Sequence, residues 1–322
     1  SRAHLDIPIA QGSSIHHISL SSADFIVVVN KNSAKACSGL KPTHGVLGDG
    51  DGSLEIFRWN PQRKHLELYQ VVKFSAFRSV SVFRQGTSSC IATIADGSLK
   101  IICIRYPSEG FRLLQNLQIH YSADVSAHHC PTDNSVLVAV SASQLGQYDK
   151  LFIYRWSSRG LQKLASIPLV SVSAISTVGH NGNCFVIVGQ NQVGGSQLPV
   201  SVYRYVHSDP QKIFETQKLM AGNVKGLSWI KSPDGKSPLL FVHSESEAKN
   251  LKAFSFKGAS GFLPTDALQV YANFHEVRVF RRSDGNHLIT MARSEDEPSA
   301  VVLMSKLKGK PFNPERSTDT RL

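Results

Sequence analysis

The chain has 322 residues, of which 41% are hydrophobic, so it is long enough for two average domains or one large all-β domain. Its 35 Lys and Arg against 24 Asp and Glu give a net charge of +11, which favours acidic partners such as nucleic acid, sulfated glycans, anionic lipid or an acidic protein surface. No run of 18 apolar residues occurs, which excludes a membrane-spanning helix and membrane insertion. Residues 1–10 lack the basic-then-apolar pattern of a signal peptide, so we expect a cytosolic protein or one whose signal has been removed.

The predicted elements are organised around one strand that recurs along the chain. It reads "LEIFRW" at 54–59, "LFIYRW" at 151–156, "VSVYRY" at 200–205 and "LKAFSF" at 251–256. Its closing aromatic residue recurs at intervals of 47, 50, 49 and 51 residues, and a weaker copy without an aromatic ends near 306. A repeat of this length indicates a fold of stacked units, in which we expect the aromatic to pack between neighbours. The closing aromatics are Trp59, Tyr106, Trp156, Tyr205 and Phe256.

Each copy of this strand belongs to a set of four. Two strands precede it, and a polar turn and a further strand follow it, as at 66–72 and 112–119. Four strands in about 49 residues are typical of a β-propeller blade, whose third strand is buried on both faces once blades stack. We therefore predict an all-β fold, a β-propeller of about six four-stranded blades, with seven possible. A seventh blade would have to lie in the polar insert at 31–53. The first two strands of each unit are expected at 14–20 and 24–30, 79–85 and 90–96, 124–130 and 135–141, 174–180 and 184–190, 224–230 and 239–245, and 276–282 and 287–293.

The two ends of the chain indicate how the ring closes. Residues 7–15 resemble 167–175, where the fourth strand of one unit leads into the first strand of the next. The sixth unit has three clear strands followed only by "KGKPF". We therefore expect residues 4–10 to complete the last blade and close the propeller, which protects the sheet edges. The predicted domains are a propeller over 1–312 and a polar tail over 313–322.

A hairpin in the second unit places two cysteines opposite each other. Asp96-Gly97 reads as a two-residue turn, and counting outward from it pairs Cys90 with Cys103 at a non-hydrogen-bonded position. The Cα atoms of such a pair lie about 4.5 Å apart, which a disulfide can bridge. We favour this bridge over two buried free thiols, and a bridge indicates an oxidising compartment. No N-x-[ST] glycosylation sequon is present, which is weak evidence against secretion.

The other cysteines are Cys37, Cys130 and Cys184. Because their number is odd, at least one of them must be free or bonded to another chain. We expect this residue to be Cys37, in the polar insert; the pairing of the other two is left open.

Two segments carry a motif of an aromatic, a basic residue and Trp, followed after about ten residues by the next strand. These segments are 57–83 and 154–178. The motif resembles the epilepsy-associated repeat (EAR, also called EPTP) of the leucine-rich glioma-inactivated proteins and the thrombospondin-domain EAR protein. The resemblance implies a secreted, non-enzymatic propeller that binds other proteins, notably cell-surface receptors. Family propellers usually have seven repeats, whereas six are found here.

Polar residues precede the first strand in three units: Asp124, Asn223 and Glu276. The first strands of a propeller surround its axis, so these side chains are expected at the mouth of the central channel. Converging oxygens there could hold Ca²⁺, which takes six to eight oxygen ligands; the alternative is acids solvated by water. No other cofactor or metal is predicted. The corresponding residues of the other units are Ser14, Ser79 and Ala174.

Four arginines occupy one repeat position, next to the closing aromatic: Arg58, Arg105, Arg155 and Arg204. They could form a positively charged arc for an acidic partner. Alternatively, their aliphatic stems pack between blades while the guanidinium groups bond loop carbonyls.

The motifs of common enzymes are absent. No GxSxG occurs, and the acidic residues are too dispersed to name an acid/base pair, so we predict that the chain is not an enzyme. We predict a non-catalytic, extracellular protein-interaction module that binds a cell-surface or matrix protein, with nucleic acid unfavoured as a partner. The alternative is an intracellular or matrix basic scaffold that binds polyanions, either nucleic acid or sulfated glycan.

Overall fold

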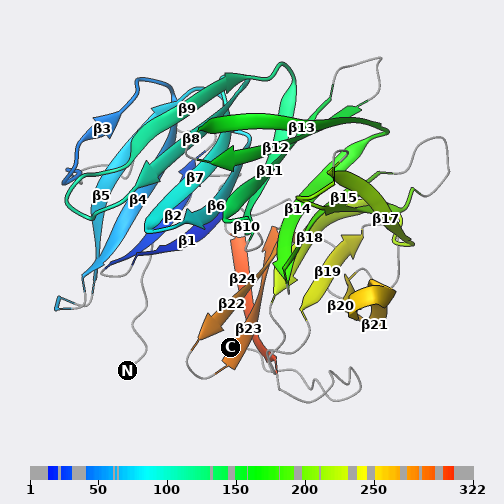
Figure 1. Ribbon diagram of the computed structural model, residues 1–322. Coiled ribbons are helices and arrows are strands. Elements are labelled where there is room, and N and C mark those ends of the chain that lie inside the picture. The colour runs from blue at the N-terminus through cyan, green and yellow to red at the C-terminus, as the bar shows by residue number, and fades with distance from the viewer. Residues whose placement is uncertain are drawn as a thin grey trace. The chain divides into compact units, whose positions relative to one another are not determined.

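The computed structural model describes most of the chain, and over the described part it consists of β-strands and one short 3-10 turn, η1 (Gly258–Ser260) (Figure 1). Two compact units are present, Ser1–Leu169 with Asn181–Cys184, and Val170–His180 with Phe185–Leu322. Among the described residues, no helix is long and apolar enough to cross a membrane. The described residues are 14–20, 23–30, 41–60, 62–63, 65–130, 133–143, 149–157, 159–180, 182–191, 198–209, 212–230, 238–244, 251–268, 274–282, 285–293 and 300–307.

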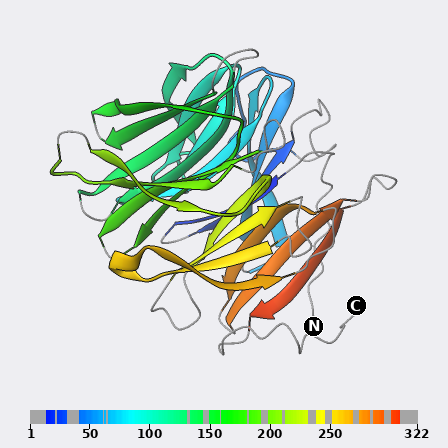
Figure 2. The same cartoon turned by 90° about the vertical axis from the view of Figure 1, so that its right-hand side faces the viewer.

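The first unit contains three sheets, in which antiparallel neighbours follow chain order (Figure 1, Figure 2). The first sheet also carries β3 (Val46–Leu47) at its edge, which pairs in parallel with β5 (His65–Phe74). The strands of the first sheet are β1 (Ser14–Ser19), β2 (Asp24–Asn30), β4 (Gly52–Asn60) and β5 (His65–Phe74). Those of the second are β6 (Ser79–Gln85), β7 (Ser88–Ala95), β8 (Ser98–Ile104) and β9 (Arg112–Gln118). Those of the third are β10 (Ser122–Cys130), β11 (Ser135–Ala142), β12 (Asp149–Ser157) and β13 (Gly160–Leu169).

The second unit continues the same pattern in its own sheets. The strands of the fourth sheet are β14 (Val172–His180), β15 (Asn183–Gln190), β16 (Val200–Tyr205) and β17 (Ile213–Leu219). Those of the fifth are β18 (Val224–Ile230), β19 (Leu239–Ser244), β20 (Leu251–Phe256) and β21 (Phe262–Leu268). The sixth sheet has β22 (Phe274–Arg282), β23 (Gly285–Arg293) and β24 (Ala300–Leu307).

The predicted repeat is confirmed, because the sheets follow the predicted units and their antiparallel strands stand in chain order, with β3 as the one addition at the edge of the first sheet. The described part of the polar insert forms no seventh sheet; it contributes β3 to the first sheet instead. The predicted closing strand at 4–10, any fourth strand after β24 and the tail at 313–322 lie outside the described residues.

Hydrophobic cores lie between successive sheets within each unit. Leu54 of β4 and Ile102 of β8 share one cluster, while Leu99 of β8 and Trp156 of β12 share the next. In the second unit, Phe185 of β15 packs with Phe256 of β20, with ring centroids 5.2 Å apart. A strand that faces a core on both sides must be apolar at consecutive positions, which explains the unbroken buried run along β8.

A glutamine on the outer strand of one sheet binds the backbone of the next sheet. Gln70 Nε2 donates to Phe111 O at 3.1 Å, and Phe111 N–H donates back to Gln70 Oε1 at 2.6 Å. In the second unit, Gln217 makes the same pair of bonds to Phe262, both at 2.8 Å. We call these two arrangements the glutamine clamps. A side-chain amide satisfies both a backbone donor and an acceptor at the point where an outer strand begins.

A glycine precedes the phenylalanine in both clamps. Gly110 and Gly261 have φ of 75° and 71°, a left-handed conformation that glycine adopts without steric cost. A Cβ on Gly261 would also lie 2.5 Å from Gln217 Oε1, so a side chain there would displace the clamp.

Candidate functional site

The Cys90–Cys103 disulfide is formed, as predicted from the turn. Asp96 and Gly97 have φ of 53° and 66°, the two positive values that a type I′ turn requires. The resulting register pairs Cys90 with Cys103, and their Cα atoms are 4.1 Å apart.

A second disulfide joins Cys130, at the end of β10, to Cys184 near the start of β15, with Cα atoms 5.8 Å apart. This pairing resolves the alternatives left by the odd number of cysteines and leaves Cys37 as the remaining one; Cys37 lies outside the described residues. Two disulfides in one chain indicate an oxidising compartment.

Asp124 is bonded to the neighbouring sheet. Its Oδ1 accepts bonds from the Ser79 hydroxyl and from the Val125 N–H, the latter at 2.8 Å. Ser79 holds the corresponding position in the preceding sheet, so the structure joins one predicted channel residue to the equivalent residue of its neighbour. Their contact joins β6 to β10, and Ala127 N–H reinforces it with a 2.9 Å bond to Ser81 Oγ. Asp124 therefore helps to hold two first strands together.

The other two predicted channel residues are placed by their backbones. Asn223 has a φ of 50° and directly precedes β18. Glu276 follows an irregularity in the pairing of β22 with β23, and its side chain lies outside the described part. Among the described residues, no three His, Cys, Asp or Glu side chains form a group that could hold a metal ion. The calcium site stays a prediction.

The four arginines do occupy equivalent places, at or just beyond the end of a third strand. Arg58, Arg155 and Arg204 lie near the ends of β4, β12 and β16, and Arg105 follows the last residue of β8. Arg105 and Arg204 are exposed, whereas Arg58 and Arg155 are partly buried. Their local partners differ, so the equal spacing does not give them equal environments.

Arg155 is held by an acid from the turn between β10 and β11. Its Nε lies 3.2 Å from Asp133 Oδ2, and the Asp133 side chain is only 4% exposed. Asp133 Oδ1 in turn accepts bonds from the Ser135 N–H and hydroxyl, at 3.1 and 2.6 Å. The expected contact with a loop carbonyl is thus replaced here by an ion pair with a carboxylate, in which Arg155 Nε makes no hydrogen bond.

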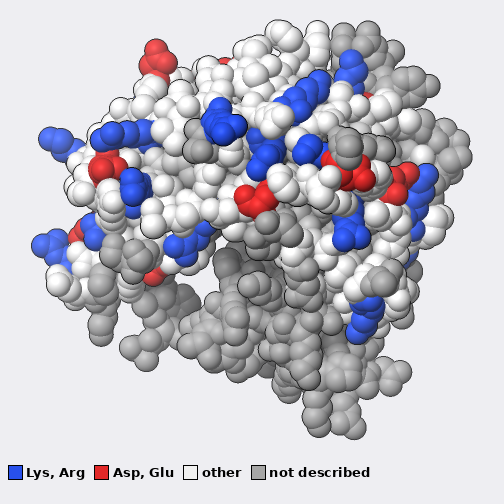
Figure 3. Space-filling model, in the orientation of Figure 1, with Lys and Arg blue, Asp and Glu red and all other residues white. Residues whose placement is uncertain are grey.

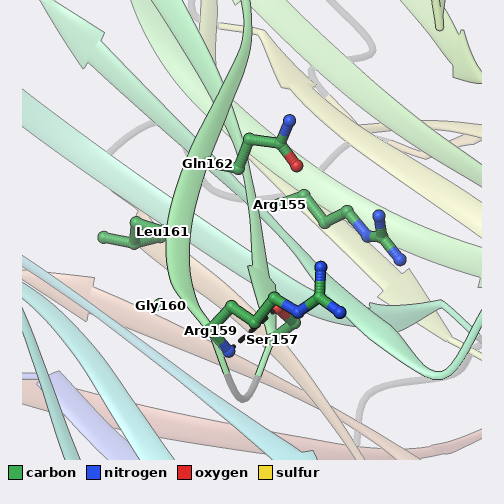
Figure 4. Close-up of a pocket in the computed structure, with 6 residues that line it drawn as sticks. All are labelled: Arg155, Ser157, Arg159, Gly160, Leu161 and Gln162. Carbon is green, nitrogen blue, oxygen red and sulfur yellow. Dashed lines mark hydrogen bonds between the residues drawn. The ribbon is translucent and has the colours of Figure 1, made fainter.

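A pocket of about 600 Å³ opens beside Arg155, at the end of the β12–β13 hairpin. Figure 4 shows the side chains of Arg155, Arg159 and Gln162 projecting to the same side of the hairpin, with Leu161 on the opposite side. The remaining lining residues are Ser157 and Gly160. The repeat pattern points to Arg155 but not to Arg159 or Gln162, because only the pairing of β12 with β13 places Gln162 opposite Arg155 and the turn with Arg159 beside them.

The closing aromatics divide into two groups. Trp156, Tyr205 and Phe256 are buried, with 6%, 4% and 7% of their surfaces exposed, as the prediction of packing between blades requires. For Trp59 and Tyr106 that prediction is wrong, since 36% and 49% of their surfaces are exposed.

The chain beyond β8 explains the exposure of Tyr106. The strand ends at Ile104, so Tyr106 lies outside the sheet, with the Arg105 guanidinium 5.2 Å from its ring centre. Phe111 fills the interior instead and packs edge-on against Phe25, with ring centroids 5.9 Å apart.

Tyr69 of the first sheet binds the segment that follows β8 through its uncharged hydroxyl group. Its hydroxyl donates to Pro107 O at 2.6 Å and accepts from Gly110 N–H at 3.1 Å. Burial raises the pKa of Tyr69 above its ordinary value, although the Gly110 bond opposes this. The phenol therefore keeps the proton that its bond to Pro107 needs.

Basic side chains are spread over much of the face shown in Figure 3, with acidic ones between them. This distribution agrees with the net charge of +11. It gives the described surface a general attraction for anions, to which individual sites must add specificity.

The comparisons with known proteins give the fold. No protein-family model matches the chain. No curated protein matches it either. Among solved structures, SapL1 lectin in complex with alpha methyl fucoside is 11% identical, with a TM-score of 0.55 and coverage of 93% of this chain and 97% of the lectin.

Two further structures bear names of enzymes. Trypanosoma rangeli sialidase in complex with sialic acid is 8% identical, with a TM-score of 0.58 over 94% of this chain and 60% of the sialidase. A putative 6-phosphogluconolactonase from Bacteroides fragilis is 14% identical, with a TM-score of 0.55 over 88% of this chain and 82% of that one. At these identities the likeness concerns the fold, and the chain is a β-propeller.

The prediction that the chain is not an enzyme is corrected by these likenesses. A sialidase and a putative 6-phosphogluconolactonase share its fold, so the propeller architecture contradicts that exclusion. The physical reason is that a catalytic site on such a scaffold is built from loop side chains of separate blades, which need not form a short sequence motif.

Proposed function

We propose that this chain is an extracellular binding module that contacts an acidic region of a cell-surface or matrix protein through two exposed aromatic residues of its first two sheets, each next to an arginine in the sequence. The pairs are Arg58 with Trp59 and Arg105 with Tyr106, and Arg58 is the partly buried arginine of the two. The proposal keeps only the protein-binding role that the resemblance to the EAR motif implies.

The observation that carries the proposal is the exposure of Trp59 and Tyr106. The aromatics at the same repeat position in the next three sheets are buried: Trp156, Tyr205 and Phe256. In the first two sheets, the residue at this position is therefore exposed where the other sheets use it in the core. Trp, Tyr and Arg are the residues most enriched at the energetic centres of protein interfaces, because they combine large apolar area with directed polar groups.

The two pairs belong to sheets that are firmly joined. Tyr69 of β5 is bonded to Pro107, next to Tyr106, and Gln70 clamps Phe111 a few residues further on. A surface on a rigid scaffold loses less conformational entropy on binding. The basic residue beside each aromatic selects for an acidic partner by charge complementarity.

The two disulfides support an extracellular location for the chain. Cys90–Cys103 and Cys130–Cys184 require oxidising conditions to form and persist. Cell-surface and matrix proteins are the partners that such a compartment offers.

The test is a screen of the purified chain against an array of recombinant cell-surface and matrix ectodomains, followed by affinity measurement for each hit. Trp59→Ala and Tyr106→Ala should each weaken binding by about tenfold or more. Met220→Ala, which truncates a side chain that is 69% exposed in the second unit, is the matched control and should bind like the wild type. An ectodomain affinity that neither aromatic substitution changes would show that this surface is not the interface.

A further inference from the structure

The β12–β13 hairpin that forms the pocket has one polar and one apolar side. Strand pairing places Arg155 opposite Gln162, and the adjacent pair is Trp156 opposite Leu161. Trp156 and Leu161 pack into the core shared with the second sheet, where the Trp156 ring lies 5.4 Å from that of Phe83. The core thus anchors one side of the hairpin, so that the side with Arg155 and Gln162 is held in place facing the pocket (Figure 4).

Arg155 is oriented toward a further ligand. Its ion pair with the buried Asp133 is made through Nε, which leaves the two terminal amino groups at the end of the side chain for the pocket. Because 26% of the Arg155 side chain is exposed, the guanidinium is partly withdrawn from water yet still reachable. The Asp133 carboxylate attracts the guanidinium electrostatically, and the terminal amino groups can still donate paired hydrogen bonds to an oxyanion.

Arg159 supplies a second positive charge from the turn. Its backbone N–H donates to Ser157 Oγ at 3.3 Å, which fixes the turn (Figure 4). The Arg159 side chain has no partner among the described residues. Two guanidinium groups and the Gln162 amide therefore meet at one pocket, and none of its six described lining residues is acidic.

These groups define the chemistry of the ligand. A guanidinium carries only donors and keeps its charge at all accessible pH values, so the ligand must offer several acceptor oxygens and a negative charge. A volume of about 600 Å³ holds more than one such group and accepts the sugar ring that carries it.

We propose that this pocket binds the sulfate group of a sulfated glycan, with Arg155 and Arg159 as its charged ligands and Gln162 as an amide donor. A sulfate ester stays ionised throughout the physiological range, and sulfated glycans are the polyanions of the extracellular space to which the disulfides point. The net charge of +11 adds long-range attraction. This proposal does not rest on the proposed protein partner, because it concerns a different sheet and a different ligand.

The test measures binding of the full chain to a heparin dodecasaccharide by titration calorimetry at several salt concentrations. Arg155→Gln and Arg159→Gln should each weaken binding by about tenfold and lower the slope of log affinity against log salt by roughly one. Arg204→Gln is the matched control, since it removes the same charge from the same repeat position in another sheet. It should change the affinity less than about twofold.

Two further variants and one further probe complete the test. Arg155→Lys keeps the charge but loses the paired geometry, so it should behave more like Arg155→Gln than like the wild type. Arg159→Gln changes an exposed turn residue and should fold normally even if a change at Arg155 does not. A 20-base-pair DNA duplex should bind more weakly than the dodecasaccharide and without sensitivity to Arg159→Gln.

Three results would overturn the proposal. One is failure of the wild-type chain to bind the dodecasaccharide at physiological salt. Another is an equal loss of affinity in Arg159→Gln and Arg204→Gln, which indicates diffuse charge attraction. The third is DNA binding of equal strength with the same dependence on Arg159, which indicates a general phosphate and sulfate site.

Discussion

At the scale of single residues, the side chains that matter most for the fold are polar ones placed between sheets. Gln70 and Gln217 each satisfy the N–H and the carbonyl of a phenylalanine that begins the outer strand of the next sheet. Without the amide, two backbone groups at a buried strand end would lose their partners, which costs more than the bond itself contributes. Ser79 and Asp124 likewise join neighbouring sheets, since a hydrogen bond between their side chains links the first strand of the second sheet to that of the third.

Gln70→Leu is therefore expected to destabilise the protein by about 2 kcal/mol, because the Phe111 N–H and carbonyl are left unpaired in a buried place. Urea unfolding followed by fluorescence measures the change. Gln62→Leu, at an exposed position in the turn after β4, is the control and should stay within about 0.5 kcal/mol of the wild type. Equal stabilities for the two variants would mean that the clamp does not hold the sheets together.

At the scale of elements, short turns set the strand register, and the register then decides which side chains meet. The type I′ turn at Asp96 and Gly97 pairs Cys90 with Cys103. In the third sheet, the pairing of Arg155 with Gln162 gives the hairpin its polar side. A shift of one residue in either hairpin would exchange the two faces of its shifted strand and destroy the arrangement in that hairpin.

Gly97→Ala should cost about 1 kcal/mol, since an alanine at a φ of 66° must adopt a left-handed conformation. The nearest atom to a Cβ there is 3.4 Å away, an ordinary contact, so the cost comes from the backbone alone. Thermal unfolding of the oxidised protein measures it. The control is Gly226→Ala, at a position with no positive φ and a nearest atom 3.8 Å away; a loss there as large as at Gly97 would contradict the explanation.

At the scale of the whole molecule, much of the described core is shared between sheets. The clusters that join β4 to β8 and β8 to β12 each need side chains from two successive sheets. The disulfides act on different lengths of chain within this arrangement. Cys90 and Cys103 are 13 residues apart, whereas Cys130 and Cys184 are 54 apart.

Removal of the longer-range bridge is expected to cost more. In the chain-entropy description, Cys130→Ser with Cys184→Ser loses about 4 kcal/mol, and Cys90→Ser with Cys103→Ser loses about 3 kcal/mol. Denaturant unfolding of the two double variants, under non-reducing conditions, gives the comparison. A larger loss for the Cys90 and Cys103 pair would mean that constraint of the unfolded chain is not the main contribution.

The sequence by itself determined the strands, their grouping into units and the Cys90–Cys103 bridge. These features depend on local periods and on one turn, which act within a few residues. It also placed Arg155 at a repeat position shared with three other arginines. Only the tertiary structure decided that Trp59 and Tyr106 are exposed while Trp156 is buried, because burial depends on what the neighbouring sheet offers. It likewise decided that Asp124 bonds to Ser79, that Cys130 pairs with Cys184 and that Arg159 joins Arg155 at a pocket. Each of these contacts joins separate strands or the two sides of a hairpin. Sheet packing and strand register set the distances between such residues, and a repeat pattern in the sequence encodes neither.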